Sequence, residues 1–173
     1  MSEFSVQDAL LIIAEQKITV REMEWIPKKT VSNPQWNEFV SACRIQSEIR
    51  EDVMFRAQFR PARVIVVGGA DITLSEIFNC AICVGPHRIL ALDSEDTAHT
   101  NKIGIGRPFY KQKLTGRTHL HLWTEGGYGY AEPIEPPLLS VESLIADFLP
   151  RANLTLLGSF RHPLKGTQLG LNL

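Results

Sequence analysis

The sequence has almost no net charge. Its 173 residues include 18 Lys and Arg and 19 Asp and Glu, which leaves a formal net charge of −1 and a pI near 6.5. Proteins that bind nucleic acid or anionic membranes usually carry an excess of Lys and Arg. The composition therefore excludes a strongly basic protein, and any contact with nucleic acid has to come from a local basic surface.

Long apolar runs and targeting signals are also missing. No segment has the length and apolarity of a membrane span, and residues 1–16 carry acidic rather than basic residues ahead of their apolar stretch, unlike a signal peptide. Repeats, heptads and low-complexity segments are absent. With 44% hydrophobic residues, residues 1–173 are expected to form a single domain with a real core. We expect a cytoplasmic protein without a membrane partner.

Cysteine is scarce, with residues only at positions 43, 80 and 83. An odd number without a disulfide pattern favours free thiols in a reducing compartment. Cys80 and Cys83 have the CxxC spacing of zinc and redox sites, but no second pair follows. Their surroundings, IFNCAICVG, are typical of a buried strand, in which residues i and i+3 point to opposite faces. We therefore expect core cysteines here and not a metal site.

The N-terminal part carries helix signals. Ser5 is a predicted N-cap for an amphipathic helix. Asn33 and Pro34 predict the start of another helix over residues 33–46, because Pro is favoured at the first helical position. Residues 1–47 are therefore expected to be mainly helical.

The middle of the chain, residues 48–135, changes to the period of strands. A helix capped by Ser140 and a tail follow over residues 136–173. Strands are expected over residues 18–27, 52–61, 62–69, 72–85, 87–94, 117–123 and 128–134. This order predicts an α+β fold with a central antiparallel sheet, a meander, flanked by N-terminal and C-terminal helices. The element order is broadly like that of the barnase and RelE-type RNase folds.

The segment THLHLW offers three interpretations. On a strand, His119 and His121 project from one face while the leucines beside them turn to the core. They could be ordinary residues of a solvated sheet face. They could also bind a metal with Glu125 and His99, because His-x-His followed by Glu resembles the first cupin motif. The cupin glycine ahead of the first histidine and the second cupin motif are missing.

The third interpretation is acid–base chemistry, since imidazole titrates near neutrality. Metal-independent RNA cleavage needs a base for the 2′-hydroxyl, an acid for the leaving oxygen and a cation for the phosphorane. The histidines could supply the first two functions, with His99 from the polar loop over residues 95–116 as a third candidate. The cation could come from Arg56, Arg60, Lys102 or Arg117.

The glycine-rich segment EGGYGY does not match a phosphate-binding loop, because no Lys-Ser/Thr follows and no helix begins there. A hairpin turn is the simpler interpretation, and a turn that closes over the histidines is the functional one. Tyr128 could stack a base, although aromatic residues on strands usually serve packing.

The stretch from Leu92 to Ile134 resembles a family of uncharacterised bacterial and phage proteins. Its members share an Asp that ends a strand, His-x-Asn in a loop, His-Leu-His-aromatic followed by Glu-Gly, and an Ala-x-Pro ending. FRAQFRP resembles the arginine-bearing strand upstream in that family. The chain departs from the family where Lys102 follows Asn101 in place of the usual Asn-Pro-Asp-Gly. The resemblance points to these positions: Asp93, His99, Asn101, His119, His121, Glu125 and Gly126.

The leading hypothesis is therefore a metal-independent ribonuclease or other phosphodiester-acting protein, of toxin or phage-defence type, without a cofactor. Its alternatives are a non-catalytic protein-binding module, such as a phage or host inhibitor, and a cupin-like metal protein. The predicted partners are RNA or a protein. The predicted catalytic residues are His99, His119, His121, Arg56 and Arg60, and the predicted substrate contacts are Asn101, Lys102, Arg117, Glu125 and Tyr128.

Overall fold

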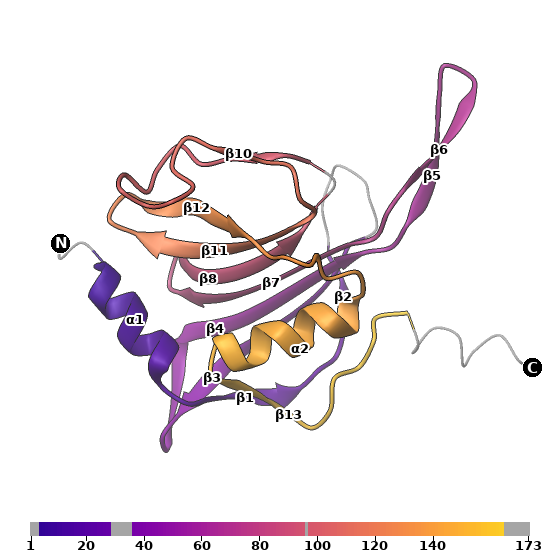
Figure 1. The fold of residues 1–173 in the computed structure, drawn as a ribbon. Helices are drawn as coiled ribbons and strands as arrows, with labels where there is room; N and C mark the ends of the chain where they lie inside the picture. Colours follow the sequence, from indigo (N-terminus) through magenta and orange to yellow (C-terminus); the bar gives the residue numbers. More distant parts are fainter. Residues whose placement is uncertain (1–3, 29–35, 96, 165–173) are drawn as a thin grey trace, which may run out of the picture.

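The computed structural model describes residues 4–28, 36–95 and 97–164. Within them, one large sheet dominates the fold (Figure 1). Its strands are β1 (Lys17–Glu22), β2 (Ile26–Pro27), β3 (Asn37–Ile45), β4 (Glu48–Arg60), β7 (Ile77–Val84), β8 (His87–Ser94), β11 (Thr118–Thr124), β12 (Gly127–Pro133) and β13 (Leu154–Leu157).

The strand order is β12-β11-β8-β7-β4-β3-β1-β13, with β2 beside β3. From β3 to β12, neighbouring strands in this path are antiparallel. The last pair, β1 and β13, is parallel, so the sheet is mixed. The fold is thus rich in sheet and contains two helices, but it is not the purely antiparallel sheet that the sequence predicts.

Helix α2 (Val141–Arg151) packs against one face of this sheet. Ser140 begins it with a capping box, in which its hydroxyl accepts a hydrogen bond from the Ser143 amide. The apolar side of the helix is buried, and Phe148 stacks on Phe55 of β4 at 6.0 Å between ring centroids. The predicted C-terminal helix is confirmed.

Helix α1 (Val6–Ala14) lies beside the other end of the sheet (Figure 1). Ser5 is its N-cap, as expected from the sequence, and it also forms a capping box with Asp8. Its last turn is capped by the buried ammonium of Lys17, which donates to the carbonyls of residues 12, 13 and 15. Neither helix in the described ranges is long and apolar enough to cross a membrane.

The predicted helix over residues 33–46 is wrong. Its part within the described residues forms β3, and residues 33–35 lie outside them. The buried residues Phe39, Ser41, Cys43 and Ile45 alternate with more exposed ones. This is the two-residue period of a strand and not the period of a helix. The N-terminal part accordingly holds one helix and several strands and is not mainly helical.

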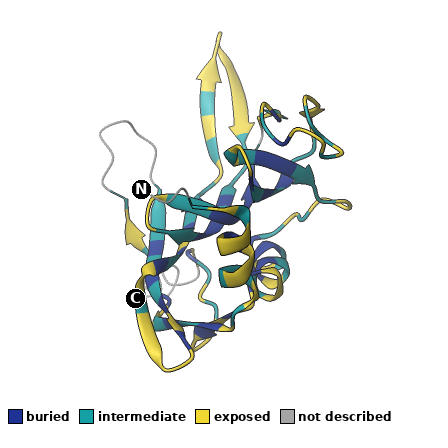
Figure 2. Cartoon of the chain, turned by 90° about the vertical axis from the view of Figure 1, so that its left-hand side faces the viewer, coloured by how far each residue is buried: buried dark blue, intermediate teal, exposed yellow. Residues whose placement is uncertain are grey.

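Two strands leave the large sheet altogether. β5 (Arg63–Val67) and β6 (Ala70–Leu74) form a hairpin that projects from the body of the molecule and is largely exposed (Figures 1 and 2). The strand predicted over residues 72–85 is therefore split between β6 and β7. The extended connection after β8 contains a second small pair, β9 (His99–Thr100) and β10 (Lys113–Leu114), and arches over β11 and β12 (Figure 1).

Candidate functional site

The face of the sheet opposite α2, called here the open face, carries two rows of directly paired residues. Residues opposite each other on neighbouring strands point to the same face. Both rows run across β4, β7, β8 and β11. All four residues of the first row are polar, and the second row has an arginine at one end, a histidine at the other and two alanines between them. The rows are Gln58, Asn79, Asp93 and His119, and Arg56, Ala81, Ala91 and His121.

The structure brings the three predicted histidines together at one end of these rows. The ring centroids of His99 and His121 are 4.9 Å apart, those of His99 and His119 are 6.0 Å apart, and those of His119 and His121 are 6.4 Å apart. This histidine cluster joins β11 to β9, which are separated by the long connection in the sequence. The three imidazoles are close enough together for two of them to exchange protons with the same bound molecule.

The histidines of β11 are buried, so the interpretation as a solvated face is wrong. His119 is 1% exposed and His121 is 5% exposed. The leucines between and after them do turn to the other side, where Leu120 and Leu122 pack against the core. The connection that carries His99 covers the imidazoles.

His121 is held as a neutral base. Its Nε2 lies 3.3 Å from Oδ2 of Asp93, and burial, together with the charge of Arg88, lowers its pKa to about 3. A neutral imidazole next to a carboxylate oxygen carries its proton on that nitrogen. Nδ1 then has a free lone pair, and it has no hydrogen-bond partner among the described residues.

Asp93 is anchored from the other side by Arg88, which donates to Oδ1. Burial raises the pKa of Asp93, and the bonded guanidinium opposes that shift. The same arginine donates to the hydroxyl of Tyr128 and lies over its ring at 5.1 Å. Tyr128 in turn stacks on His121, with centroids 5.5 Å apart. These contacts fix the plane and the tautomer of the His121 ring.

Sequence reasoning missed Arg88. Strict alternation back from Asp93 would place it on the core face, because the two positions are an odd number of residues apart. A bulge between β7 and β8 changes the phase, so that Arg88 pairs with Cys83 and lies on the open face. A charged residue in the otherwise apolar HRILAL strand is the one signal that could have suggested this.

His119 and His99 complete the cluster in different ways. Burial lowers the pKa of His119, and its Nε2 has no partner in the described part of the chain. Nε2 of His99 lies 3.1 Å from Oδ1 of Asn101 and 3.1 Å from the carbonyl oxygen of Gly129. Both partners accept, so this nitrogen is the donor.

Asn101 lies in a network of structural hydrogen bonds, and its contact with a substrate stays a prediction. Its side chain is fully buried and donates to the carbonyls of Phe109 and Ala131, while its Oδ1 accepts from the Ala131 amide. These bonds tie the connection between β9 and β10 to β12. We call this arrangement the Asn101 clasp, and it holds His99 over β11.

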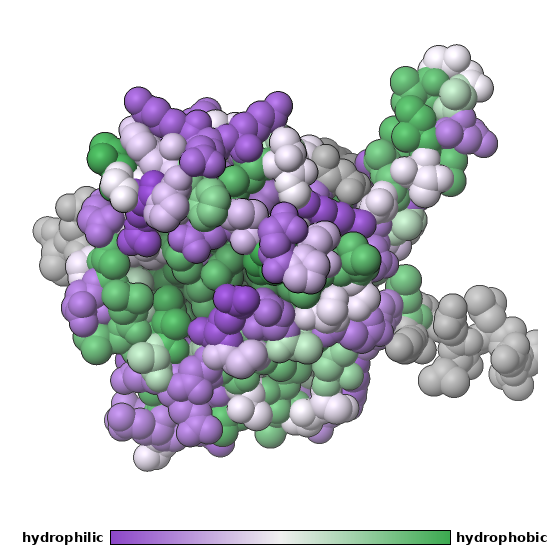
Figure 3. Space-filling view, viewed as in Figure 1, coloured by the Kyte–Doolittle hydropathy of each residue, from purple (hydrophilic) through white to green (hydrophobic). Residues whose placement is uncertain are grey.

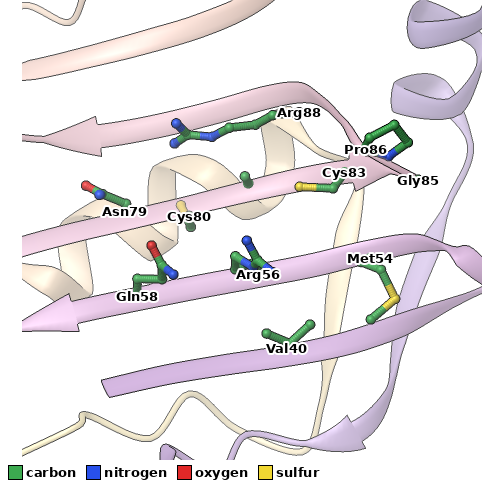
Figure 4. A pocket seen from close by; sticks show the side chains of 11 residues that line it. Val40, Met54, Arg56, Gln58, Asn79, Cys80, Cys83, Gly85, Pro86 and Arg88 are labelled. Atoms are coloured by element: carbon green, nitrogen blue, oxygen red, sulfur yellow. The ribbon is translucent and has the colours of Figure 1, made fainter. Parts of the chain in front are cut away.

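A pocket of about 440 Å³ opens beside the cluster on the open face (Figure 4). Side chains from β4, β7 and β8 line it, among them Arg56, Gln58, Asn79 and Arg88. Arg56 is exposed, and no hydrogen bond or ion pair holds its guanidinium within the described ranges. Because Arg88 also bonds Asp93, it connects the pocket to the histidine cluster.

Two other predicted arginines lie away from this pocket. Arg60 donates to the carbonyl of Ser75 and lies over the ring of Trp36. Arg117 donates to the carbonyl of Glu76. Neither lines the pocket, whereas Arg88 does.

The predicted contacts Lys102 and Glu125 are also outside the pocket. Lys102 is exposed on the covering connection. Glu125 lies in the β11–β12 turn, where its side chain is 75% exposed and 3.9 Å from Arg107. The turn itself is a hairpin, which is the simpler of the two interpretations of EGGYGY.

The donor groups give no support to the cupin interpretation. Among the residues that the structure describes, no three His, Cys, Asp or Glu side chains are placed to hold a metal ion. The CxxC pair does not form a joint site either. Cys80 is buried in the core, Cys83 is partly exposed in the pocket, and both thiols are free.

Comparison with known proteins adds no name to this geometry. No model of a protein family matches the chain, and neither does any curated protein or any solved structure. Its function has to be argued from the site alone.

Proposed function

We propose that the open face cleaves a phosphodiester without a metal, as a ribonuclease whose general base is His121. The observation that carries this proposal is the Asp93–His121 pair, with the Nδ1 lone pair of His121 unpartnered among the described residues and next to two more imidazoles. A carboxylate that fixes one ring nitrogen leaves the other to accept a proton.

In the proposed reaction, Nδ1 of His121 takes the proton of a ribose 2′-hydroxyl after the covering connection has opened, because opening reduces the burial that lowers the pKa of His121 in the closed fold. The 2′-oxygen attacks the adjacent phosphorus, and the 5′-oxygen leaves with a proton from a second imidazole. The acid has to be a doubly protonated imidazole, and we assign this role to His99: its Nε2–H is held by two fixed oxygens, and the proton on its other nitrogen is the one transferred. The products are a 2′,3′-cyclic phosphate and a free 5′-hydroxyl.

The developing charge on the phosphorane is opposed by guanidinium groups. Arg88 lies between the pocket and the cluster, and Arg56 is an exposed cation on the far side of the pocket. Three strand spacings separate β4 from β11, about 14 Å between backbones. We therefore assign Arg88 to the reacting phosphate and Arg56 to a neighbouring phosphate of the same strand.

Burial of the imidazoles means that the substrate needs an opening movement. The covering connection is held by the Asn101 clasp, which is a set of hydrogen bonds and not an apolar core. Active-site covers of this kind open on the microsecond to millisecond timescale. We assign the connection between β9 and β10 to this role.

The resemblance to the bacterial and phage family fits this proposal in the positions that it picks out. Asp93, His99, Asn101, His119 and His121 all lie in or beside the histidine cluster. A toxin or phage-defence setting is part of the same proposal.

The test is incubation of the purified protein with RNA of mixed sequence in EDTA. Cleavage should persist in the chelator and fall about 10²- to 10⁴-fold in His121→Ala, the range for loss of a general base. Arg56→Gln, at an exposed position, should weaken cleavage without affecting folding. The matched control is His162→Ala, because His162 lies against Phe59 and Phe160, away from the pocket. Intact RNA with the wild-type protein, or full activity of a folded His121→Ala, refutes the proposal.

A non-catalytic protein-binding module is the second candidate, and a different part of the molecule favours it. The β5–β6 hairpin exposes several large apolar side chains away from the histidine cluster (Figure 3). Such a surface is typical of protein contacts. Under this alternative, His121→Ala leaves function intact while changes to the hairpin abolish it.

A further inference from the structure

The β5–β6 hairpin, called here the arm, is a regular two-stranded element. Gly68 and Gly69 form its turn with φ of +61° and +85°, and Val67 pairs with Ala70 on either side. Two central residues with positive φ make the tight hairpin turn whose twist matches that of the strands. The register of the arm is therefore fixed by its own sequence.

The surface of the arm is unusually apolar for an exposed element. Val64 is 60% exposed, Val66 is 70% exposed and Val67 is 53% exposed, and Ile72 on the second strand is 42% exposed. Arg63 is the one charged residue of β5. An isolated two-stranded hairpin is at best marginally stable in water. The arm therefore fits an element that is completed by another strand.

The outer edge of β5 is open in the described part of the chain, since β5 pairs with β6 alone. In a two-residue hairpin, hydrogen-bonded pairs alternate with non-bonded pairs away from the turn. Val67 and Ala70, next to the turn, form a bonded pair, so Val66 and Val64 belong to non-bonded pairs. The backbone N–H and C=O groups of Val66 and Val64 therefore point away from β6, to the outer edge. The outer edge thus offers two peptide groups flanked by valine side chains.

This edge is complementary to itself. We propose that the arm pairs with the arm of a second copy of this chain, β5 against β5 and antiparallel about a two-fold axis at Ile65. In this pairing, Val64 of each copy forms backbone hydrogen bonds with Val66 of the other copy. The two Ile65 residues lie opposite each other as a non-bonded pair. The four strands form one sheet with a continuous valine surface.

The edge of β6 is less suited to the same pairing. Its outward residues are Asp71 and Thr73, by the same alternation, so pairing there would bring carboxylates to the centre of the new sheet. Lysine and proline, which often protect open edges, are absent from β5, and its one charged residue, Arg63, lies at the end of the strand away from the turn. Edge chemistry therefore selects β5.

The size of the contact sets the expected affinity. Two five-residue strands bury less than the roughly 1,200 Å² of a standard stable interface, so we expect a dissociation constant of about 10–100 μM. Sedimentation velocity of the wild-type protein should show a monomer at low micromolar concentration and a dimer at several hundred micromolar. A monomer across that whole range overturns the proposal.

Val66→Lys should abolish the dimer, because it places like charges beside the paired strands. Ile105→Lys is the matched control, since Ile105 is a large apolar residue that is 82% exposed elsewhere on the surface. Melting curves verify that both variants are folded. A dimer that survives Val66→Lys, or one that Ile105→Lys abolishes equally, contradicts arm pairing.

Cysteine cross-linking tests the register itself. Antiparallel non-bonded pairs have Cα atoms about 4.5 Å apart, which is within the range for a disulfide. In a Cys83→Ser background, Ile65→Cys should form an intermolecular disulfide under mild oxidation. Ile72→Cys, the partner of Ile65 on β6, should not. Equal cross-linking of the two variants, or none with Ile65→Cys at dimer-forming concentrations, refutes the register.

Discussion

Acidification should destabilise this fold through His121. Burial lowers the pKa of His121 to about 3 in the folded protein, whereas a free imidazole has a pKa of about 6.5. Between these values the unfolded chain binds a proton that the folded chain excludes. The contribution of His121 to stability is therefore fully present above the pKa of the unfolded chain, about 6.5. It is lost progressively as the pH falls from there toward the pKa of the folded protein, about 3.

The size of the effect follows from the two pKa values. At pH 5, about 97% of unfolded His121 is protonated against about 1% in the fold, and the linkage relation converts this into a loss of about 2 kcal/mol relative to pH 7. His119 shifts in the same direction for the same reason. Asp93 acts with the opposite sign, because burial raises its pKa. A comparison of variants is therefore needed to isolate His121.

Urea unfolding at pH 7 and pH 5 provides the measurement. The wild-type protein should lose about 2 kcal/mol more than His121→Gln, whose amide can still donate to Asp93. His162→Gln serves as the control and should follow the wild type. If the wild type and His121→Gln lose the same stability between the two pH values, His121 is not the excluded base that the geometry requires.

Three further predictions concern the elements that position the site. Gly104→Ala should destabilise the protein by about 1–3 kcal/mol more than Gly106→Ala. Both glycines have φ near +85°, but only at Gly104 would a Cβ lie 2.4 Å from the ring of Tyr130, so thermal unfolding of the pair isolates the clash. Asn101→Ala should lower the free energy of unfolding by about 1–3 kcal/mol for each backbone group left unpaired. It should also speed amide hydrogen exchange between β9 and β10, and unchanged exchange there would contradict the clasp. Lys17→Met removes the cap of α1 and should lower the free energy of unfolding by about 1–3 kcal/mol, with exchange increased in the last turn of that helix.

The elements that the sequence predicts correctly are those decided by local interactions. Ser5 and Ser140 each begin a helix through a capping box that involves the residue three positions later. In β4, the alternation of Val53, Phe55, Ala57 and Phe59 is a complete period-two pattern, and all four are buried. Such signals need no knowledge of the rest of the fold.

The failures come from tertiary context. In β3, the positions of Trp36, Phe39, Val40 and Cys43 fit a helical period as well as a strand, and the sequence alone cannot choose. The long neighbour β4 decides, because it pairs with residues 37–45, with one register shift between Ala42 and Cys43. The position of Arg88 depends on a bulge that only the pairing with β7 creates.

The candidate site shows the same division. Alternation places His119 and His121 on one face, and the resemblance ties them to His99, but neither indicates burial. Burial follows from the Asn101 clasp, whose partners lie up to 30 residues away in the chain. The position of Asn101 does not favour the predicted substrate contact, since a buried amide bonded to three backbone groups has little left for a ligand.

The open face also carries a cost that the fold alone does not explain. Oδ1 of Asn79, Nε2 of His119 and Nδ1 of His121 are buried without a hydrogen-bond partner among the described residues. Each such group costs about 1–3 kcal/mol, a large share of the roughly 5–15 kcal/mol that stabilises a typical domain. Apolar side chains of similar size would remove that cost. All three atoms belong to two adjacent rows beside the arginine-lined pocket. Nε of Arg63, which is also buried without a partner in the described part of the chain, lies apart from them in the arm, and the grouping of the other three beside the pocket supports the proposal that a polar ligand binds there.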